Sequence, residues 1–244
     1  MKQKQIQTNF QRVETKYILD RATLAKLEVE MKPYLVADEY ATSTITNIYF
    51  DNDDFQMIQD SIARKGGREK LRLRTYAERP TDDSQVFLEI KKKSEEVGFK
   101  YRLVSNLVSV MDYIEKGVAD HTIADERVKS EVVQLQERYL DLKAKMVISY
   151  DRYSMKGSED KKVWVTVDSN VRFRDYDVDL TLGRHGWPLL ENDKVIMEIK
   201  VPGQYPTWLA DILNRHGLED QSFSKYGKAY LKANEMLNQT LVKS

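Results

Sequence analysis

The sequence predicts an α+β fold in which helices clad an antiparallel β-barrel whose inside forms a cation-lined tunnel. Three observations lead to this fold class. Runs of residues with the period-two alternation of β-strands recur along the chain, and helical runs separate and follow them. Nearly every predicted strand also carries basic residues on one face. If such a sheet closes, the charged faces line its inside and the apolar faces pack under the helices.

Length and composition are those of one globular domain, which we expect to span residues 1–244. The 39 basic and 39 acidic residues give no net charge, so overall charge gives no reason to expect nucleic-acid or membrane binding. The absence of cysteine excludes disulfides and thiolate metal ligands. No signal peptide and no apolar run of membrane-spanning length is visible, which predicts a cytoplasmic protein.

The N-terminal part predicts strands that alternate with helices. Residues 11–19 alternate between charged and apolar side chains, which predicts a strand. Asp20 is placed to cap a helix that ends before Pro33. Residues 43–50 are rich in β-branched and aromatic residues, which favours a second strand, and residues 54–64 follow as a short helix.

The middle of the chain predicts a β-meander followed by helices. Three strands, 68–78, 85–93 and 97–105, are separated by polar turns. From 106 to 143 the periodicity becomes helical, with two helices that meet near Gly117–Thr122. The remaining elements are predicted as strands 146–154, 162–174 and 194–201, loops at 157–158 and 183–188, and helices 206–215 and 223–239, the last capped by Ser222 or Ser224.

The strand at 68–78 shows how the charge is sorted. Arg68, Lys70, Arg72 and Arg74 share one face, and leucines occupy the other. Neighbouring cations on that face lie about 6.6 Å apart and repel by roughly 2–3 kcal/mol in a partly buried setting. Over all strands the same face holds the acids Glu14, Glu89, Asp168 and Glu198 and fourteen cations: Arg12, Lys16, Arg68, Lys70, Arg72, Arg74, Lys91, Lys93, Lys100, Arg102, Arg152, Arg172, Arg174 and Lys200.

A solvated sheet face is the alternative interpretation, and polar alternation in antiparallel sheets usually has that meaning. A solvated face, however, mixes both signs of charge to avoid cross-strand repulsion. We therefore interpret the sorted face as a polyanion site, because arginine forks and lysine charges match phosphate oxygens. The carboxylates of Glu14, Glu89 and Glu198 suit Mg²⁺ or Mn²⁺, which combines one or two carboxylates with substrate phosphate oxygens.

Lys225 and Lys228 stand one turn apart at the start of the last predicted helix. Basic residues at a helix N-terminus oppose the helix dipole, so a nearby anion would explain them. An exposed lysine pair without a partner is the alternative that the sequence leaves open.

Seven short motifs occur in one order along the chain, and together they resemble a known family. They are Arg12-x-Glu14-x-Lys16-Tyr17, Ile48-Tyr49-Phe50-Asp51, Lys70-Leu71-Arg72-Leu73-Arg74-x-Tyr76, Phe87-Leu88-Glu89-Ile90-Lys91, Ser149-Tyr150-Asp151-Arg152, Met197-Glu198-Ile199-Lys200 and Phe223-Ser224-Lys225-Tyr226. The ordered set covers about residues 10–232 and resembles the polyphosphate polymerase domain of the vacuolar transporter chaperone (VTC) complex, in its free-standing bacterial form. That domain belongs to the triphosphate tunnel metalloenzymes, with the CYTH-type folds.

The resemblance implies a barrel tunnel that binds triphosphate or polyphosphate and transfers the γ-phosphate of ATP to a polyphosphate chain, with Mn²⁺ or Mg²⁺. It implies that Glu198 holds the metal, that Tyr150 adds a hydrogen bond, and that Lys225 and Lys228 close one tunnel mouth. The residues that would grip the phosphates are Lys16, Arg72, Arg74, Lys91, Lys100 and Arg152, all but Lys100 being candidates for the catalytic set. Further candidates for substrate binding, from their place on the charged face, are Arg12, Lys70, Arg172, Arg174 and Lys200.

One position departs from the family pattern, because Trp164 stands where the eukaryotic domain has an arginine, for which Arg172 or Arg174 would have to substitute. Three functions therefore stay open: an ATP-using polyphosphate polymerase, an inorganic or nucleoside triphosphatase with water as acceptor, and a non-catalytic polyphosphate or nucleotide sensor. The resemblance does not extend to a regulatory SPX domain or a membrane channel. We therefore expect a membrane-protein partner in trans if synthesis is coupled to translocation.

Overall fold

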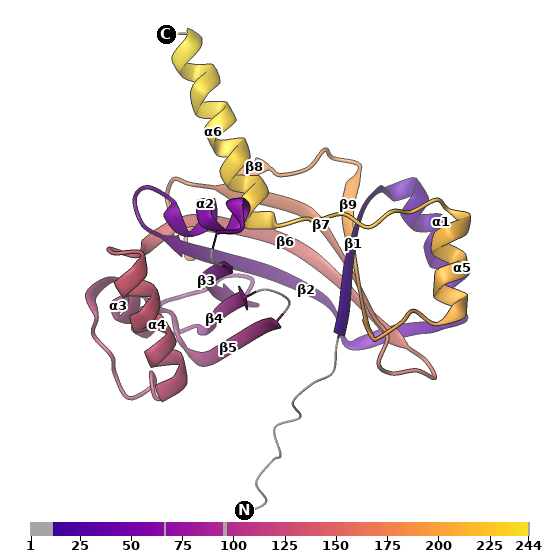
Figure 1. Cartoon of the computed structure of the whole chain (residues 1–244), viewed down its shortest axis with the longest axis horizontal. Helices are drawn as coiled ribbons and strands as arrows, with labels where there is room; N and C mark the ends of the chain where they lie inside the picture. The colour runs from indigo at the N-terminus through magenta and orange to yellow at the C-terminus, as the bar shows by residue number, and fades with distance from the viewer. Residues whose placement is uncertain (1–11, 66, 95–96, 244) are drawn as a thin grey trace, which may run out of the picture. The chain divides into compact units, whose positions relative to one another are not determined.

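The structure is a computed structural model that describes residues 12–243 apart from residues 66, 95 and 96. These residues form nine strands and six helices, which are labelled in Figure 1. In chain order they are β1 Arg12–Asp20, α1 Arg21–Met31, β2 Leu35–Asp51, α2 Gln56–Ala63, β3 Arg68–Thr75, β4 Gln85–Ser94, β5 Val97–Asn106, α3 Leu107–Lys116, α4 Glu126–Arg138, β6 Lys143–Gly157, β7 Trp164–Arg174, β8 Trp187–Pro188, β9 Lys194–Pro202, α5 Thr207–Arg215 and α6 Lys225–Lys243.

The strands are joined by hydrogen bonds in the order β1-β9-β7-β6-β2-β3-β4-β5, and β8 pairs with β7. The pairings of β1 with β9, β2 with β3, β3 with β4, β4 with β5 and β7 with β9 are antiparallel. These pairings confirm the predicted α+β class built on an antiparallel sheet. Among the described residues the order has two ends, β1 and β5, whereas a closed barrel would join its first and last strands.

The chain groups into two compact units, and the prediction of a single domain stays a prediction. Unit 1 comprises Met1–Ser43, Asp151–Ser169 and Leu190–Phe223, and unit 2 comprises Thr44–Tyr150, Asn170–Leu189 and Ser224–Ser244. The strands β2, β6 and β7 each have residues in both units. No helix in the described part of the chain is both long enough and apolar enough to cross a membrane.

Unit 1 buries the apolar faces of β1 and β9 together with α1 and α5, which lie side by side (Figure 1). The register places Tyr17 opposite Met197 and Thr15 opposite Ile199, so alternate residues of the two strands reach one face. The core of unit 1 includes Tyr17, Leu19, Leu27, Met31, Val165, Met197, Ile199, Val201, Leu209 and Leu213. The charged residues of these strands lie on the other face, as the alternation predicts.

Unit 2 buries the apolar face of the β3-β4-β5 meander against α3 and α4 (Figure 1). The strands contribute Leu71, Leu73, Leu88, Ile90 and Leu103, and the helices contribute Val110, Ile114, Val128, Val132 and Leu135. Burying these side chains stabilises the sheet by about 1.5–3 kcal/mol each relative to exposure. This packing fixes the opposite face of the meander as the side that carries the arginines and lysines.

The observed boundaries differ from the predicted ones mainly in β2 and β8. The strand predicted at 43–50 already begins at Leu35, because residues 36–44 pair in the sheet although their side chains are mostly exposed and do not alternate. β8 lies within the loop predicted at 183–188, where Trp187 pairs with Phe173. The predicted cap at Asp20 is confirmed, since its carboxylate accepts the Thr23 N–H at 2.7 Å.

Candidate functional site

The charged face of β3, β4 and β5 in unit 2 gathers basic residues from three strands. The antiparallel register places four side chains in one row across β2 to β5: Tyr49, Arg72, Glu89 and Arg102. It places three lysines in the next row: Lys70, Lys91 and Lys100. Like charges directly opposite one another in a sheet are destabilising, and a bound anion would relieve that repulsion. The basic cluster is defined here as Lys70, Arg72, Arg74, Lys91, Lys100 and Arg102.

Glu89 lies in the middle of the basic cluster with 1% of its surface exposed. Its Oε2 pairs with Arg72 Nη2 at 2.7 Å, and its Oε1 pairs with Lys100 Nζ at 2.6 Å and Arg102 Nε at 3.4 Å. Burial raises the pKa of Glu89, but the charges of Arg72, Arg74 and Lys100 outweigh burial and lower that pKa to about 2. Glu89 therefore holds the cations of this face together, and its role as a metal ligand stays a prediction.

Arg74 is a buried member of the basic cluster, and two hydrogen bonds fix its guanidinium. Its Nε donates to Asn47 Oδ1 at 2.8 Å, and its Nη2 donates to Tyr150 OH at 2.9 Å. Asn47 is fully buried, and its Nδ2 donates to the Ile148 carbonyl at 2.9 Å. A guanidinium held in this way keeps its orientation before any ligand arrives. Asn47 could not be recognised from the sequence, because a single polar residue inside a strand has no pattern that marks it.

Tyr49 brings a buried phenol to the same cluster. Arg72 Nη1 donates to Tyr49 OH at 3.3 Å, and the Tyr49 ring stacks on Tyr226 with ring centroids 4.6 Å apart. Burial raises the pKa of the Tyr49 phenol, but the charges of Arg72, Arg74 and Lys70 outweigh burial and lower that pKa. The motif that contains Tyr49 was visible in the sequence, but its alternation did not assign the phenol a role.

The first turn of α6 is attached to the basic cluster within unit 2. Lys70 Nζ donates to Ser224 Oγ at 2.8 Å, and Ser224 Oγ accepts the Gly227 N–H at 3.1 Å, which identifies Ser224 as the cap. The ammonium of Lys225 lies 4.5 Å from the centroid of the Tyr150 ring. Lys228, one turn further along α6, is exposed.

A second group of charged residues lies in unit 1, on β1, β7 and β9. The register places Lys16, Glu198 and Thr166 in one row and Glu14, Lys200 and Trp164 in the next. Lys16 Nζ lies 2.7 Å from Glu14 Oε1 and 4.0 Å from Glu198 Oε2, and Lys200 forms an ion pair with Glu198. Burial raises the pKa of Glu198, but Lys200, Lys16 and Arg152 outweigh burial and hold that pKa well below its usual range. We call Lys16, Lys200 and Glu198 the Glu198 cluster.

The other predicted arginines have partners of their own. Arg152 binds the buried Asp168 through two hydrogen bonds, from Nε at 2.6 Å and from Nη2 at 2.8 Å. Arg174 is fully buried and donates to four backbone carbonyls, those of Asp177, Asp179, Gly183 and His185. Arg172 is exposed and donates to the Gly186 carbonyl at 2.9 Å. The side chain of Arg12 lies outside the described residues.

Arg174 therefore organises the loop between β7 and β8, and its donors are already used by that loop. Its predicted role in phosphate binding stays a prediction that the structure gives no reason to favour. The alternation of Arg172 and Arg174 is visible in the sequence. The folding of the following loop back over Arg174 is not visible there, because it depends on tertiary contacts.

The charged faces of the strands offer a divalent cation single carboxylates and no cluster of three or more acidic or histidine ligands within the described residues. Mg²⁺ and Mn²⁺ at phosphate-transfer sites commonly take one or two carboxylates and complete their shell with phosphate oxygens and water. The buried, ionised Glu198 has the donor chemistry for this arrangement.

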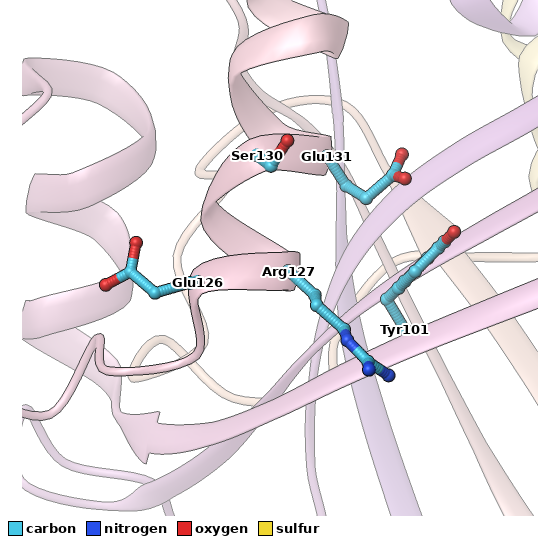
Figure 2. A pocket seen from close by; sticks show the side chains of 5 residues that line it. All are labelled: Tyr101, Glu126, Arg127, Ser130 and Glu131. Carbon is cyan, nitrogen blue, oxygen red and sulfur yellow. The ribbon is translucent and has the colours of Figure 1, made fainter. Parts of the chain in front are cut away.

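A pocket of about 460 Å³ lies elsewhere in unit 2, between α4 and β5 (Figure 2). Figure 2 shows its lining residues, Glu126, Arg127, Ser130 and Glu131 on the helix and Tyr101 on the strand. Tyr101 alternates with Lys100 and Arg102 along β5, so the pocket lies on the side of the strand opposite to the basic cluster. Its lining mixes both signs of charge, and it does not have the character of a phosphate site.

Comparison with known proteins gives one family. A family model described as the VTC domain matches residues 11–234. A curated relative, vacuolar transporter chaperone complex subunit 4 of Schizosaccharomyces pombe, is 23% identical over 268 residues. The alignment covers 90% of this chain but 37% of the relative, so the chain spans little more than a third of the length of the protein it matches.

Among solved structures, a putative adenylate cyclase from Bacillus halodurans has a TM-score of 0.55 at 14% identity, covering 87% of this chain and 93% of its own. This likeness indicates a shared fold. A putative adenylate cyclase from Vibrio parahaemolyticus has a TM-score of 0.46 at 11% identity, covering 91% of this chain and 98% of its own. That score is too low to support an argument.

Proposed function

Because the chain belongs to the VTC domain family, we propose that it is a metal-dependent phosphotransferase that transfers the γ-phosphate of ATP to a polyphosphate chain. The observation that carries the proposal is the basic cluster. Six cations share one sheet face with the buried carboxylate of Glu89, four of them pair with it, and Lys70, Lys91 and Lys100 form one row across three neighbouring strands. Such a face binds a polyanion of closely spaced charges, and ATP and polyphosphate are of this class.

The residues of the basic cluster contribute to phosphate binding in different ways. The guanidinium of Arg72 has a fork of donors that matches phosphate oxygens, and the exposed Lys91 and Lys100 add point charge. Arg74, held by Asn47 and Tyr150, presents its charge from a fixed position. Phosphoryl transfer requires mainly positioning and neutralisation of charge, and the cluster supplies both.

The Glu198 cluster fits a divalent cation. Glu198 is buried, and its pKa is lowered, so it is an ionised carboxylate at neutral pH. A bound Mg²⁺ or Mn²⁺ would neutralise charge on the phosphate oxygens. Lys16 and Lys200 hold the Glu198 carboxylate in place through their ion pairs. We propose Glu198 as the protein's ligand for this cation, and Glu14, which is exposed and pairs with Lys16, as a weaker candidate.

In the proposed reaction a terminal oxygen of the polyphosphate chain attacks the γ-phosphorus of ATP, and the bond from that phosphorus to the bridging oxygen breaks. ADP leaves with the electron pair, and the polyphosphate chain grows by one unit. The attacking phosphate oxygen is already ionised at neutral pH, so this transfer needs no general base. The side chains of the basic cluster orient the two phosphate groups and stabilise the charge that spreads over the transferred one.

A triphosphatase is the second candidate, and Trp164 favours it. Trp164 pairs with Lys200 across β7 and β9. The resemblance to the eukaryotic domain implies an arginine at this position, where this chain has an indole. A site with one arginine fewer has less charge for holding an acceptor phosphate beside ATP, and water is then the easier acceptor. The third possibility, a polyphosphate or nucleotide sensor, uses the same cations without turnover.

One experiment separates these functions. The purified chain is incubated with ATP and MnCl₂, the products are resolved on a polyphosphate gel, and free phosphate is measured in parallel. A ladder of lengthening chains supports the polymerase, free phosphate without a ladder supports the triphosphatase, and tight triphosphate binding with neither product supports the sensor. Glu198→Gln should abolish the metal-dependent turnover while triphosphate binding persists. Glu159→Gln, at an exposed glutamate of unit 1, serves as the control and should behave as wild type.

The name of the Schizosaccharomyces pombe relative places that protein in a vacuolar transporter chaperone complex. For this chain we propose a cytoplasmic location and a membrane-protein partner acting in trans. Fractionation of cells and co-purification from solubilised membranes test them.

A further inference from the structure

The Thr166 hydroxyl is a buried polar group that has no hydrogen bond to any described residue. Thr166 lies on β7 with 8% of its surface exposed. Its Oγ1 is buried, and among the residues that the structure describes it has no hydrogen-bond partner. Buried polar side chains are nearly always hydrogen-bonded, and an exception usually marks an ion, a water molecule or a function.

Other buried hydroxyls in the described part of the chain have hydrogen-bond partners. Ser61 Oγ donates to the Glu69 carbonyl at 2.8 Å, and Thr75 Oγ1 donates to the Gln85 carbonyl at 3.2 Å. The Glu89 and Glu131 oxygens that lack hydrogen bonds form ion pairs with lysines instead. Thr166 has neither kind of partner among the described residues, so its hydroxyl calls for a separate explanation.

The position of Thr166 supplies that explanation. The register pairs Thr166 on β7 with Glu198 on β9, and Glu198 with Lys16 on β1, all within unit 1. Residues directly opposite in an antiparallel pair have Cβ atoms about 4.5–5.5 Å apart and point to the same face. A hydroxyl oxygen and a carboxylate oxygen on one face are both hard donors of the kind that Mg²⁺ and Mn²⁺ prefer.

We infer that the Thr166 hydroxyl contacts the divalent cation that Glu198 holds, either as a ligand or through one of the cation's water molecules. The inference rests on the proposed function, because it assumes the metal-dependent phosphate site. It assigns a role to a residue that none of the sequence motifs singled out. It also gives a reason for the threonine at this position of β7. A valine would fill the same volume and would bury no polar atom that lacks a partner among the described residues.

The test compares Thr166→Val, which removes the hydroxyl at nearly constant shape, with Thr166→Ser, which restores it. Binding of inorganic triphosphate is measured by calorimetry on the full chain with MnCl₂ and, separately, with EDTA. For wild type and Thr166→Ser, Mn²⁺ should tighten the binding. For Thr166→Val, that tightening should fall by about tenfold, while the affinity in EDTA stays as in wild type.

A second readout without metal separates this role from a structural one. In EDTA, Thr166→Val should melt at or above the wild-type temperature, because it replaces an unpaired buried hydroxyl with a methyl group. The matched control, Thr75→Val, should melt about 2–4 °C lower, because it breaks the hydrogen bond to the Gln85 carbonyl.

Two results would overturn the inference while leaving the proposed function in place: an undiminished Mn²⁺ effect in Thr166→Val, or a melting temperature of Thr166→Val as low as that of Thr75→Val. The absence of a Mn²⁺ effect on triphosphate binding in wild type would overturn the inference together with the metal dependence of the proposed function. If wild type binds no triphosphate with or without Mn²⁺, the proposed function fails, and the inference fails with it.

Discussion

Glu89 stands between Arg72 and Arg102 in one row, and its negative charge cancels part of the charge that a phosphate chain would bind. Glu89→Gln should therefore bind triphosphate about tenfold more tightly than wild type, since a nearby like charge is removed from the ligand's surroundings. The unliganded variant should be less stable, by about 3–5 kcal/mol, because buried cations lose their partner. Calorimetry and urea unfolding check the two effects. A loss of metal-dependent turnover with unchanged affinity would instead support Glu89 as a metal ligand.

The lowered pKa of Glu89 also predicts how stability depends on pH. Its pKa is about 2 in the folded chain against an ordinary value of 4.5, so the unfolded chain binds more protons between these values. The contribution of Glu89 to the free energy of unfolding should hence be complete above about pH 4.5. It should fall by up to about 3 kcal/mol as the pH approaches 2. Glu198, whose pKa is lowered for the same reason, adds a loss of the same sign. Urea unfolding of Glu89→Gln over this range should show a shallower decline than wild type, and an equal decline would contradict the prediction.

Arg72 is the cluster residue whose loss should affect binding most directly. It pairs with Glu89 and Tyr49 and is largely buried, so a phosphate there would make charge-assisted hydrogen bonds to it. Arg72→Ala should weaken triphosphate binding by roughly 2–4 kcal/mol, measured by calorimetry. Arg79→Ala, at an exposed arginine in the loop after β3, should leave the affinity unchanged. Equal affinities of the two variants would remove the basic cluster as the phosphate site.

At the scale of elements, the first turn of α6 depends on Ser224. Its hydroxyl caps the helix at Gly227 and accepts a hydrogen bond from Lys70. Ser224→Ala should lower the free energy of unfolding by about 1 kcal/mol, the usual effect of losing a cap. Ser222→Ala, two residues earlier and exposed, is the matched control and should have no measurable effect. If thermal unfolding gave the same shift for both, Ser224 would not be the cap.

The elements that the sequence predicted best are those whose side chains alternate strictly between polar turns. β4 and β5 match the predicted strands to within one residue at each end, because apolar residues on one face and charges on the other leave a single register. The first half of β2 was missed, since the exposed residues 36–44 carry no alternation. The periodicity of hydrophobic residues cannot reveal a strand segment in which neither face packs in a core.

For the candidate site, the sequence predicted which residues share a face but not which distant segments contact them. Alternation placed Arg72, Glu89 and Lys100 on one face, and the register confirms that placement. The fixing of Arg74 by Asn47, the diversion of Arg174 to a loop and the unpaired hydroxyl of Thr166 depend on contacts between distant segments. Local periodicity carries no information about such contacts, so sequence reasoning could not find them.

At the scale of the whole molecule, each unit has its own hydrophobic core. The strands β2, β6 and β7 have residues in both units, so loss of either core disrupts strands that belong to the other. We therefore predict one cooperative unfolding transition. Ile90→Ala in unit 2 and Ile199→Ala in unit 1 should each shift that same transition to a lower temperature and lower its free energy of unfolding by about 2–5 kcal/mol. Two separate calorimetric peaks in either variant would show that the units unfold independently.

The last strand of the hydrogen-bonded order, β5, has a consequence for how copies of the molecule meet in solution. Among the described residues it ends the sheet, and its Phe99 and Val104 are about half exposed. A terminal strand with exposed apolar residues is a template for aggregation through pairing with a strand of another copy. Lys100 and Arg102, exposed on the same strand, oppose that pairing by charge repulsion. We therefore expect variants that neutralise these two cations to lose soluble yield as well as phosphate affinity.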